Sequence, residues 1–167
     1  AVRVGIEGEA ALSPEMENRG IRLKTSVATS IYYLSFNWLD PVVGAQGDAA
    51  EQERARKLRQ AISIVVDNEE FISIFANGRG VPGQGPIPPG IFGFRGGGDG
   101  FNPVVYEKTG GAWRRKSIAQ AKKLIAEAGY PNGRDVNSGQ PLVLYLDTTG
   151  GGPGGKARLD WYRKQFQ

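Results

Sequence analysis

Cysteine and histidine are both absent from this chain of 167 residues. Without cysteine no disulfide can form and no thiolate can hold a metal, a composition that suits an exported protein as well as a cytosolic one. Without histidine the commonest general base and metal ligand is missing. Long apolar runs are absent as well: none approaches the ~20 residues that a membrane-spanning helix needs, so no such helix is expected.

These absences weaken every catalytic interpretation of the remaining motifs. A serine hydrolase lacks its histidine here, and no Ser-x-x-Lys sequence replaces it. Gly78–Gly83 spells G-x-G-x-x-G, but a dinucleotide loop needs a strand before it and a helix after it, and Pro82 opposes that helix. The acidic group at 67–70 is explained by helix capping. We therefore expect no enzyme, no catalytic residue, no metal site and no cofactor.

Glycine and proline are abundant instead, at 25 and 10 residues, which indicates long loops between elements. The length is enough for one domain with a core. Alternating apolar residues predict strands, and these strands mix with helices without a strict β-α alternation. The expected fold class is therefore α+β, a small mixed sheet with helices packed on it. The segments predicted as strands are 1–8, 21–26, 30–37, 101–107 (at most an edge strand) and 141–147.

The most regular stretch runs from Glu53 to Phe94 and predicts a helix, a tight break, a second helix and a Gly/Pro-rich loop. Asp67 is expected to cap the second helix, and Asn77-Gly78 to end it. Ser13-Pro14 and Ser117 predict two further helix starts, and 156–167 predicts a final helix that buries Leu159, Tyr162 and Phe166. One common core is expected to contain Leu58, Ile62, Val65, Phe71, Ile72, Phe75, Leu124 and Ile125.

Basic residues gather in two runs, which raises nucleic acid as a partner. The first contains Arg54, Arg56, Lys57 and Arg59, and the second is Arg114–Lys116. The net charge is only +4, and each run stands at the N-terminal end of a predicted helix, where a solvated face is the ordinary interpretation. A nucleic-acid-binding module is therefore kept as the alternative function.

An aromatic segment offers a better indication of function. Tyr32, Tyr33 and Phe36 lie on a predicted strand that Trp38 follows. Aromatic rings with a polar tip suit a cleft that holds a peptide or a sugar. Alternation requires one side of the strand to pack, so we expect one of Tyr32 and Tyr33 to face a ligand and the other to face the core.

Several motifs, in this order, resemble family 5 of the bacterial extracellular solute-binding proteins. They are Tyr32–Asn37 (YYLSFN), Leu58–Ile62 (LRQAI), Val66–Ile72 (VDNEEFI), Asn77-Gly78, Gly85–Gly90 (GPIPPG) and Ala121–Pro131 (AKKLIAEAGYP). Each motif alone is common, whereas their succession over residues 30 to 166 is specific.

The resemblance implies the substrate-binding receptor of an ABC importer, for oligopeptides or dipeptides, in the periplasm or as a cell-surface lipoprotein. Such receptors are longer than this chain and close two lobes on a ligand by hinge motion. Residues 1–167 are thus expected to be part of the C-terminal lobe. The implied partners are a small-molecule or peptide ligand and a membrane permease, with no nucleic acid.

In that family this aromatic strand lies near the ligand groove, so Asn37 and Trp38 at its end join Tyr32 and Tyr33 as expected ligand-binding residues. The family's aspartate for a peptide amino terminus belongs to a motif beyond Gln167, so it cannot be assigned here. With only part of one lobe present, uncovered surface and strand edges are expected to promote self-association.

Overall fold

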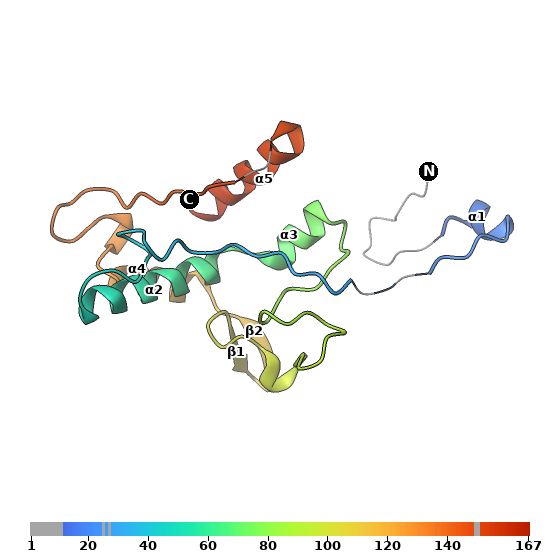
Figure 1. Cartoon of the computed structure of the whole chain (residues 1–167), viewed down its shortest axis with the longest axis horizontal. Coiled ribbons are helices and arrows are strands. Elements are labelled where there is room, and N and C mark those ends of the chain that lie inside the picture. Colours follow the sequence, from blue (N-terminus) through green and yellow to red (C-terminus); the bar gives the residue numbers. More distant parts are fainter. Residues whose placement is uncertain (1–11, 25, 27, 149–150) are drawn as a thin grey trace. The chain divides into compact units, whose positions relative to one another are not determined.

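The computed structural model describes residues 12–24, 26, 28–148 and 151–167 (Figure 1). The strand predicted at 1–8 lies outside the described residues. The chain divides into two compact units. The first contains the described residues up to Tyr32 together with 67–100, and the second contains 33–66 and 101–167. Each unit is described by itself.

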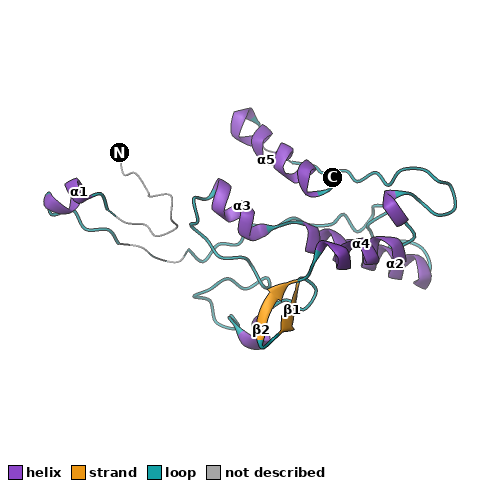
Figure 2. Ribbon diagram, turned by 180° about the vertical axis from the view of Figure 1, so that it is seen from behind, coloured by secondary structure: helices purple, strands orange, loops and turns teal. Residues whose placement is uncertain are grey.

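The core of the second unit lies between two helices, α2 (Ala49–Val65) and α4 (Ile118–Glu127), which run side by side in Figures 1 and 2. Small side chains lie at their contact and let the helix axes approach closely. The buried cluster consists of Ala61, Ile64, Val65 and Ala121, with Leu124 and Ile125 packed against it. Leu58, also on α2, is 1% exposed.

Capping boxes start both helices. The Asp48 carboxylate accepts the amide protons of Ala50 and Glu51, and Glu51 reaches back to the Asp48 amide. Ser117 and Gln120 do the same for α4, as the sequence predicts. The start of α2 was predicted too late, because the Gly/Ala composition of 44–50 indicates a loop although Asp48 is a good N-cap.

The sheet of this unit is one hairpin, coloured orange in Figure 2: β1 (Tyr106–Thr109) pairs antiparallel with β2 (Ala112–Arg115). Gly110 and Gly111 form its two-residue turn with φ of 59° and 84°, the left-handed geometry that hairpin turns require. The Arg115 guanidinium donates to the carbonyls of Ile64 (2.6 Å) and Val66 (3.1 Å). The hairpin is thus attached to the C-terminal end of α2.

Two further elements of the second unit follow α4. The 3-10 turn η2 (Pro131–Gly133) follows α4, and α5 (Gly152–Gln165) ends the described chain. α5 begins earlier than predicted and buries Trp161, whereas Leu159 and Tyr162 are half-buried and Phe166 is exposed. Trp161 is therefore a core residue that the sequence prediction missed.

The first unit contains α1 (Pro14–Asn18), α3 (Asn68–Phe75) and the 3-10 turn η1 (Gly98–Gly100). Ser13 caps α1, and the Asp67 carboxylate accepts the Glu70 amide proton at 2.9 Å at the start of α3. Asn77 and Gly78 take φ of 50° and 70° just after α3. These caps and the helix end confirm the predictions.

The prediction of one common core is wrong for α3. Phe71, Ile72 and Phe75 are only half-buried, and they belong to the first unit while α2 and α4 belong to the second. Ile62 is half-buried as well. Periodicity shows that each helix has an apolar face, but it does not say which helices share a core.

Three predicted strands are not paired in the described chain: 21–26, 30–37 and 141–147. Only Pro141 makes a bridge, to Arg134. Alternation is a property of one segment, whereas a strand also needs a neighbour that donates and accepts its backbone hydrogen bonds. The α+β class is confirmed nevertheless: β1 overlaps the segment predicted at 101–107 at Tyr106 and Glu107, and β2 lies where no strand was predicted.

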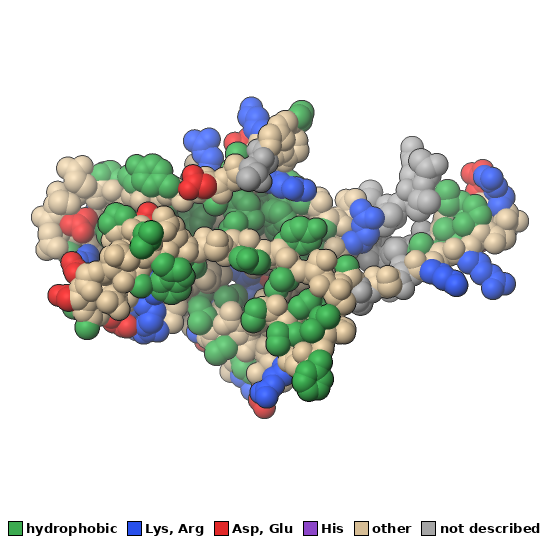
Figure 3. All heavy atoms as spheres, in the orientation of Figure 1, with side chains coloured by type: hydrophobic (Ala, Val, Ile, Leu, Met, Phe, Trp, Pro, Cys, Tyr) green, Lys and Arg blue, Asp and Glu red, His purple; other side chains and the backbone are tan. Residues whose placement is uncertain are grey.

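Because these segments are unpaired, many of their apolar side chains are exposed to solvent. Figure 3 shows hydrophobic side chains, in green, on the surface of the molecule. Among the described residues, every helix is too short or too polar to cross a lipid bilayer.

The core assignment predicts a large difference between two leucines of the second unit. Leu58→Ala should lower the free energy of unfolding by about 2–5 kcal/mol, because it opens a cavity at a closed site. Leu39→Ala removes the same atoms from an exposed residue and should change it by less than about 0.5 kcal/mol. Urea unfolding followed by circular dichroism measures both, and equal losses would contradict this core.

Candidate functional site

The four predicted ligand-binding residues are all exposed. Tyr32 is 96% exposed and belongs to the first unit, whereas Tyr33, Asn37 and Trp38 belong to the second. Tyr33 is 78% exposed, so neither tyrosine shows the packing that we expected of one of them. The structure brings Asn37 and Trp38 together in one turn, and that turn is the best-defined part of the candidate site.

Hydrogen bonds close the turn at 37–46. The Asn37 side chain accepts the Leu39 amide proton at 3.0 Å. Asp40 Oδ1 accepts those of Val42 and Val43 at 2.8 and 2.9 Å. These Asx-type contacts are typical of aspartate and asparagine in tight turns.

The Trp38 carbonyl is fixed from the far side of the same turn. It accepts the amide proton of Ala45 at 3.0 Å and a proton from the Gln46 side chain at 2.8 Å. At Gly44, a Cβ atom would overlap the carbonyl oxygens of Trp38 and Asp40. Glycine is therefore required at this position, and the backbone that carries Trp38 has little freedom.

Arg59 joins this turn to α2. Its Nη1 donates to the carbonyls of Val43 (2.7 Å) and Gly44 (2.9 Å). Its Cζ atom lies 4.6 Å from the centroid of the Trp38 ring, in cation–π geometry. Burial, and then the positive charge of Arg56, lower the pKa of Arg59 below its ordinary value.

The sequence prediction missed this role of Arg59 by grouping it with a basic run. One signal could have found it: Asp40-Pro41 and Gly44 mark a chain reversal between the aromatic segment and the next helix. A reversal that short brings residues before it close to the following helix.

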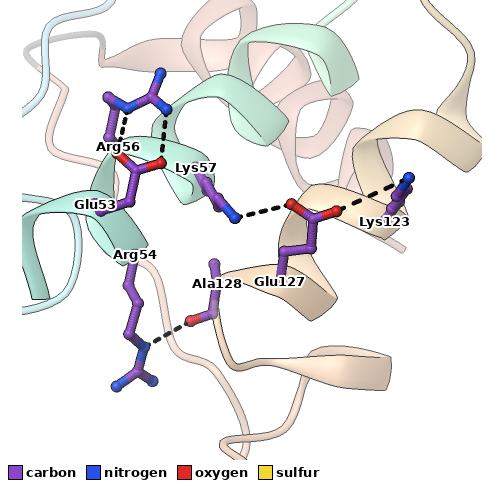
Figure 4. A network of polar contacts seen from close by, with 7 residues as sticks. All are labelled: Glu53, Arg54, Arg56, Lys57, Lys123, Glu127 and Ala128. Atoms are coloured by element: carbon purple, nitrogen blue, oxygen red, sulfur yellow. Dashed lines mark hydrogen bonds and ion pairs between the residues drawn. The ribbon is translucent and has the colours of Figure 1, made fainter. Parts of the chain in front are cut away.

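The other basic side chains at the start of α2 also bond within the second unit, as Figure 4 shows. Arg54 Nε donates to the Ala128 carbonyl at 3.0 Å. Arg56 pairs with Glu53, and Lys57 Nζ lies 2.9 Å from a Glu127 oxygen. The hydrogen bond from Lys57 is the main cause of the lowered pKa of Glu127.

An open hollow of about 250 Å³ lies beside these contacts. It is lined by Pro41, Val42, Gln46, Gly47, Glu51, Arg54, Ala55 and Tyr130. Arg54 Cζ lies 5.7 Å from the centroid of the Tyr130 ring, and Arg54 Nη2 lies 3.6 Å from Asp135 Oδ2. The arginine that lines this hollow is therefore already bound to other groups of the protein. No group of acidic side chains suited to a metal ion is found among the described residues.

A family model described as "Bacterial extracellular solute-binding proteins, family 5 Middle" matches residues 7–167. The chain therefore belongs to this family, which confirms the resemblance. Members of the family are transport receptors that bind a solute without converting it, so the chain is not expected to be an enzyme.

Two curated relatives share part of the sequence. Heme-binding protein A of Haemophilus influenzae is 34% identical over 88 residues, 52% of this chain and 14% of that protein. Glutathione-binding protein GsiB of Pectobacterium atrosepticum is 30% identical over 77 residues, 46% of this chain and 12% of that protein. The matched regions are thus a small part of both relatives. No solved structure matches significantly.

The turn predicts a position where one methyl group disrupts the site. Gly44→Ala should destabilise the protein by about 1–3 kcal/mol, because backbone carbonyls surround the added Cβ. Gly85→Ala is the matched control, since a Cβ there meets nothing within 4 Å. Thermal unfolding compares the variants, and an unchanged Gly44→Ala protein would contradict the turn geometry.

Asp135 predicts a contribution to stability that is lost in acid. Amide hydrogen bonds from Ser138 and Asn137 are the main reason why its pKa is lowered. A carboxylate whose pKa is lowered by folding stabilises the protein above its unfolded pKa of about 3.9, and this contribution disappears as the pH falls through the folded pKa. Asp135→Asn keeps an acceptor oxygen but cannot titrate, so its urea midpoint should fall less below pH ~4. Parallel curves for both proteins would exclude this role.

Proposed function

We propose that this chain forms part of the C-terminal lobe of the substrate-binding receptor of an ABC importer. The observation that carries the proposal is the family match over residues 7–167, combined with the exposed Trp38 held in a closed turn. A ligand receptor needs aromatic surface that is open before the ligand arrives and rigid enough to bind without a large entropic cost.

The ligand class is proposed to be short peptides. One relative is named for binding glutathione, itself a tripeptide, and the other for binding heme. Backbone amides and side chains of a peptide suit a wall that combines Tyr33 and Trp38 with the polar Asn37. Tyr32, in the first unit, stays a predicted ligand-binding residue of its own unit.

In this proposal, transport depends on closure of the two lobes on the ligand. The ligand would shift an open two-lobe receptor toward a closed form by hinge motion, and the closed form would dock on the permease. Such a receptor acts in the periplasm or as a lipoprotein at the cell surface. It needs no catalytic group and no cofactor.

The alternative, a nucleic-acid-binding module, loses support from the contacts of the basic run. Arg54, Lys57 and Arg59 bond to groups of the second unit, so these cations serve the fold. Steep salt-dependent retention on heparin would favour the alternative.

The proposal predicts weak binding by these 167 residues alone. Part of one lobe leaves one side of the ligand in water, so peptides should bind no tighter than about millimolar, equivalent to roughly −4 kcal/mol. Exposed apolar segments should promote self-association instead. Calorimetry with a mixed short-peptide library, alongside light scattering, tests both. Micromolar binding by a monomer would mean that these residues hold a complete site.

A further inference from the structure

The indole of Trp38 has two unlike faces. The Arg59 guanidinium covers one of them at 4.6 Å, yet 57% of the residue remains exposed. Since one face is covered, that exposure belongs mainly to the opposite face and the ring edge. The ring is therefore backed by a cation and open to solvent in front.

Hydrogen bonds and a close turn fix the backbone that carries the ring, and Arg59 contacts the ring itself. The Trp38 carbonyl accepts two hydrogen bonds, Gly44 permits the close turn, and Arg59 binds both the ring and the turn. Arg59 is suited to this because its planar guanidinium can stack and donate at once, which lysine cannot do in the same way. A ring held this way loses little freedom when a ligand stacks on it.

The cation behind the ring also affects which groups can stack in front. A π face attracts cations through its negative quadrupole, and the charge of Arg59 opposes that attraction on the open face. A positively charged ligand group is disfavoured there, whereas a planar uncharged group can still form an offset stack.

We propose that the open face of Trp38 is a stacking platform for planar, uncharged ligand groups such as an aromatic side chain, and that Arg59 is its positioning residue. This inference rests on the proposed function, because it assigns part of the specificity of the same site. It adds that the site discriminates against cationic side chains at this position.

The test follows the indole N–H signals of ¹⁵N-labelled protein by NMR while capped Ala-Phe-Ala or capped Ala-Lys-Ala is added. The Trp38 signal is assigned by its loss in Trp38→Phe, and the signals of Trp113 and Trp161 report whether the fold is intact. In the unsubstituted chain, the phenylalanine peptide should move the Trp38 signal and bind more tightly than the lysine peptide. Trp38→Leu should lower the affinity for the phenylalanine peptide by roughly three- to tenfold.

Arg59→Gln distinguishes positioning from simple structural support. It should reduce the preference for phenylalanine over lysine, because the cation behind the ring is removed. Arg56→Gln is the matched control: it removes a positive charge from the same helix, where Arg56 pairs with Glu53, and should leave the preference unchanged. If Arg59→Gln disturbs the fold, Trp38→Leu still tests whether the ring binds the peptide. This variant keeps the hydrogen bonds from Arg59 to the carbonyls of Val43 and Gly44, so the turn should stay attached to α2.

Three results would overturn the inference. The Trp38 signal could stay fixed while other signals move, or Trp38→Leu could bind the phenylalanine peptide as tightly as the unsubstituted chain. A folded Arg59→Gln variant could also keep the full preference for the phenylalanine peptide over the lysine peptide. The importer-receptor proposal, which rests on the family match, stands in all three cases, although the first two results would remove Trp38 from the proposed ligand wall. If neither peptide moves any signal of the protein up to its solubility limit, the platform fails, while the importer-receptor proposal, which predicts weak binding by this part of a lobe, does not.

Discussion

The contact between α2 and α4 is the interaction on which the second unit depends. Ala61 and Ala121 are both fully buried where the helices meet, and side chains this small allow the close approach that buries Ile64 and Leu124 beside them. Larger residues at either alanine would separate the helices. Three other parts of this unit are bound to α2 through arginines: the β1–β2 hairpin through Arg115, the turn at 37–46 through Arg59, and the end of α4 through Arg54.

Arginine makes these attachments because each one ends on backbone carbonyls. A planar guanidinium with several donors can satisfy two carbonyls at once, as Arg59 does at Val43 and Gly44. The sequence shows only that cations are clustered, and a solvated face or a phosphate-binding surface produces the same cluster. What the sequence cannot show is the position of the carbonyls, because these belong to helix ends and turns distant along the chain.

The same distinction explains how much could be predicted. Helix starts at Ser13, Asp67 and Ser117 and the helix end at Asn77-Gly78 were found because a cap involves residues at most a few positions apart. The segments at 30–37 and 141–147 were wrong as strands because pairing depends on a distant neighbour. The Gly110-Gly111 hairpin was missed although its turn signal is local. At the candidate site, exposure of Trp38 agrees with the ligand-binding expectation, but its support by Arg59 crosses from one element to another.

Exposure by itself does not distinguish a ligand surface from a packing surface. Tyr145 is 85% exposed on an extended segment whose alternating residues resemble a strand, a pattern suited to burial against a neighbouring layer. Trp38 is less exposed, yet its turn is closed by hydrogen bonds and its ring is backed by Arg59. An aromatic side chain on a packing surface is ordered by the partner that covers it. One that binds ligands gains affinity when the protein already holds it in the bound conformation, because less entropy is lost on binding. By this criterion we propose the hydrogen-bonded turn, more than the extended aromatic segment before it, as the ligand surface of this chain.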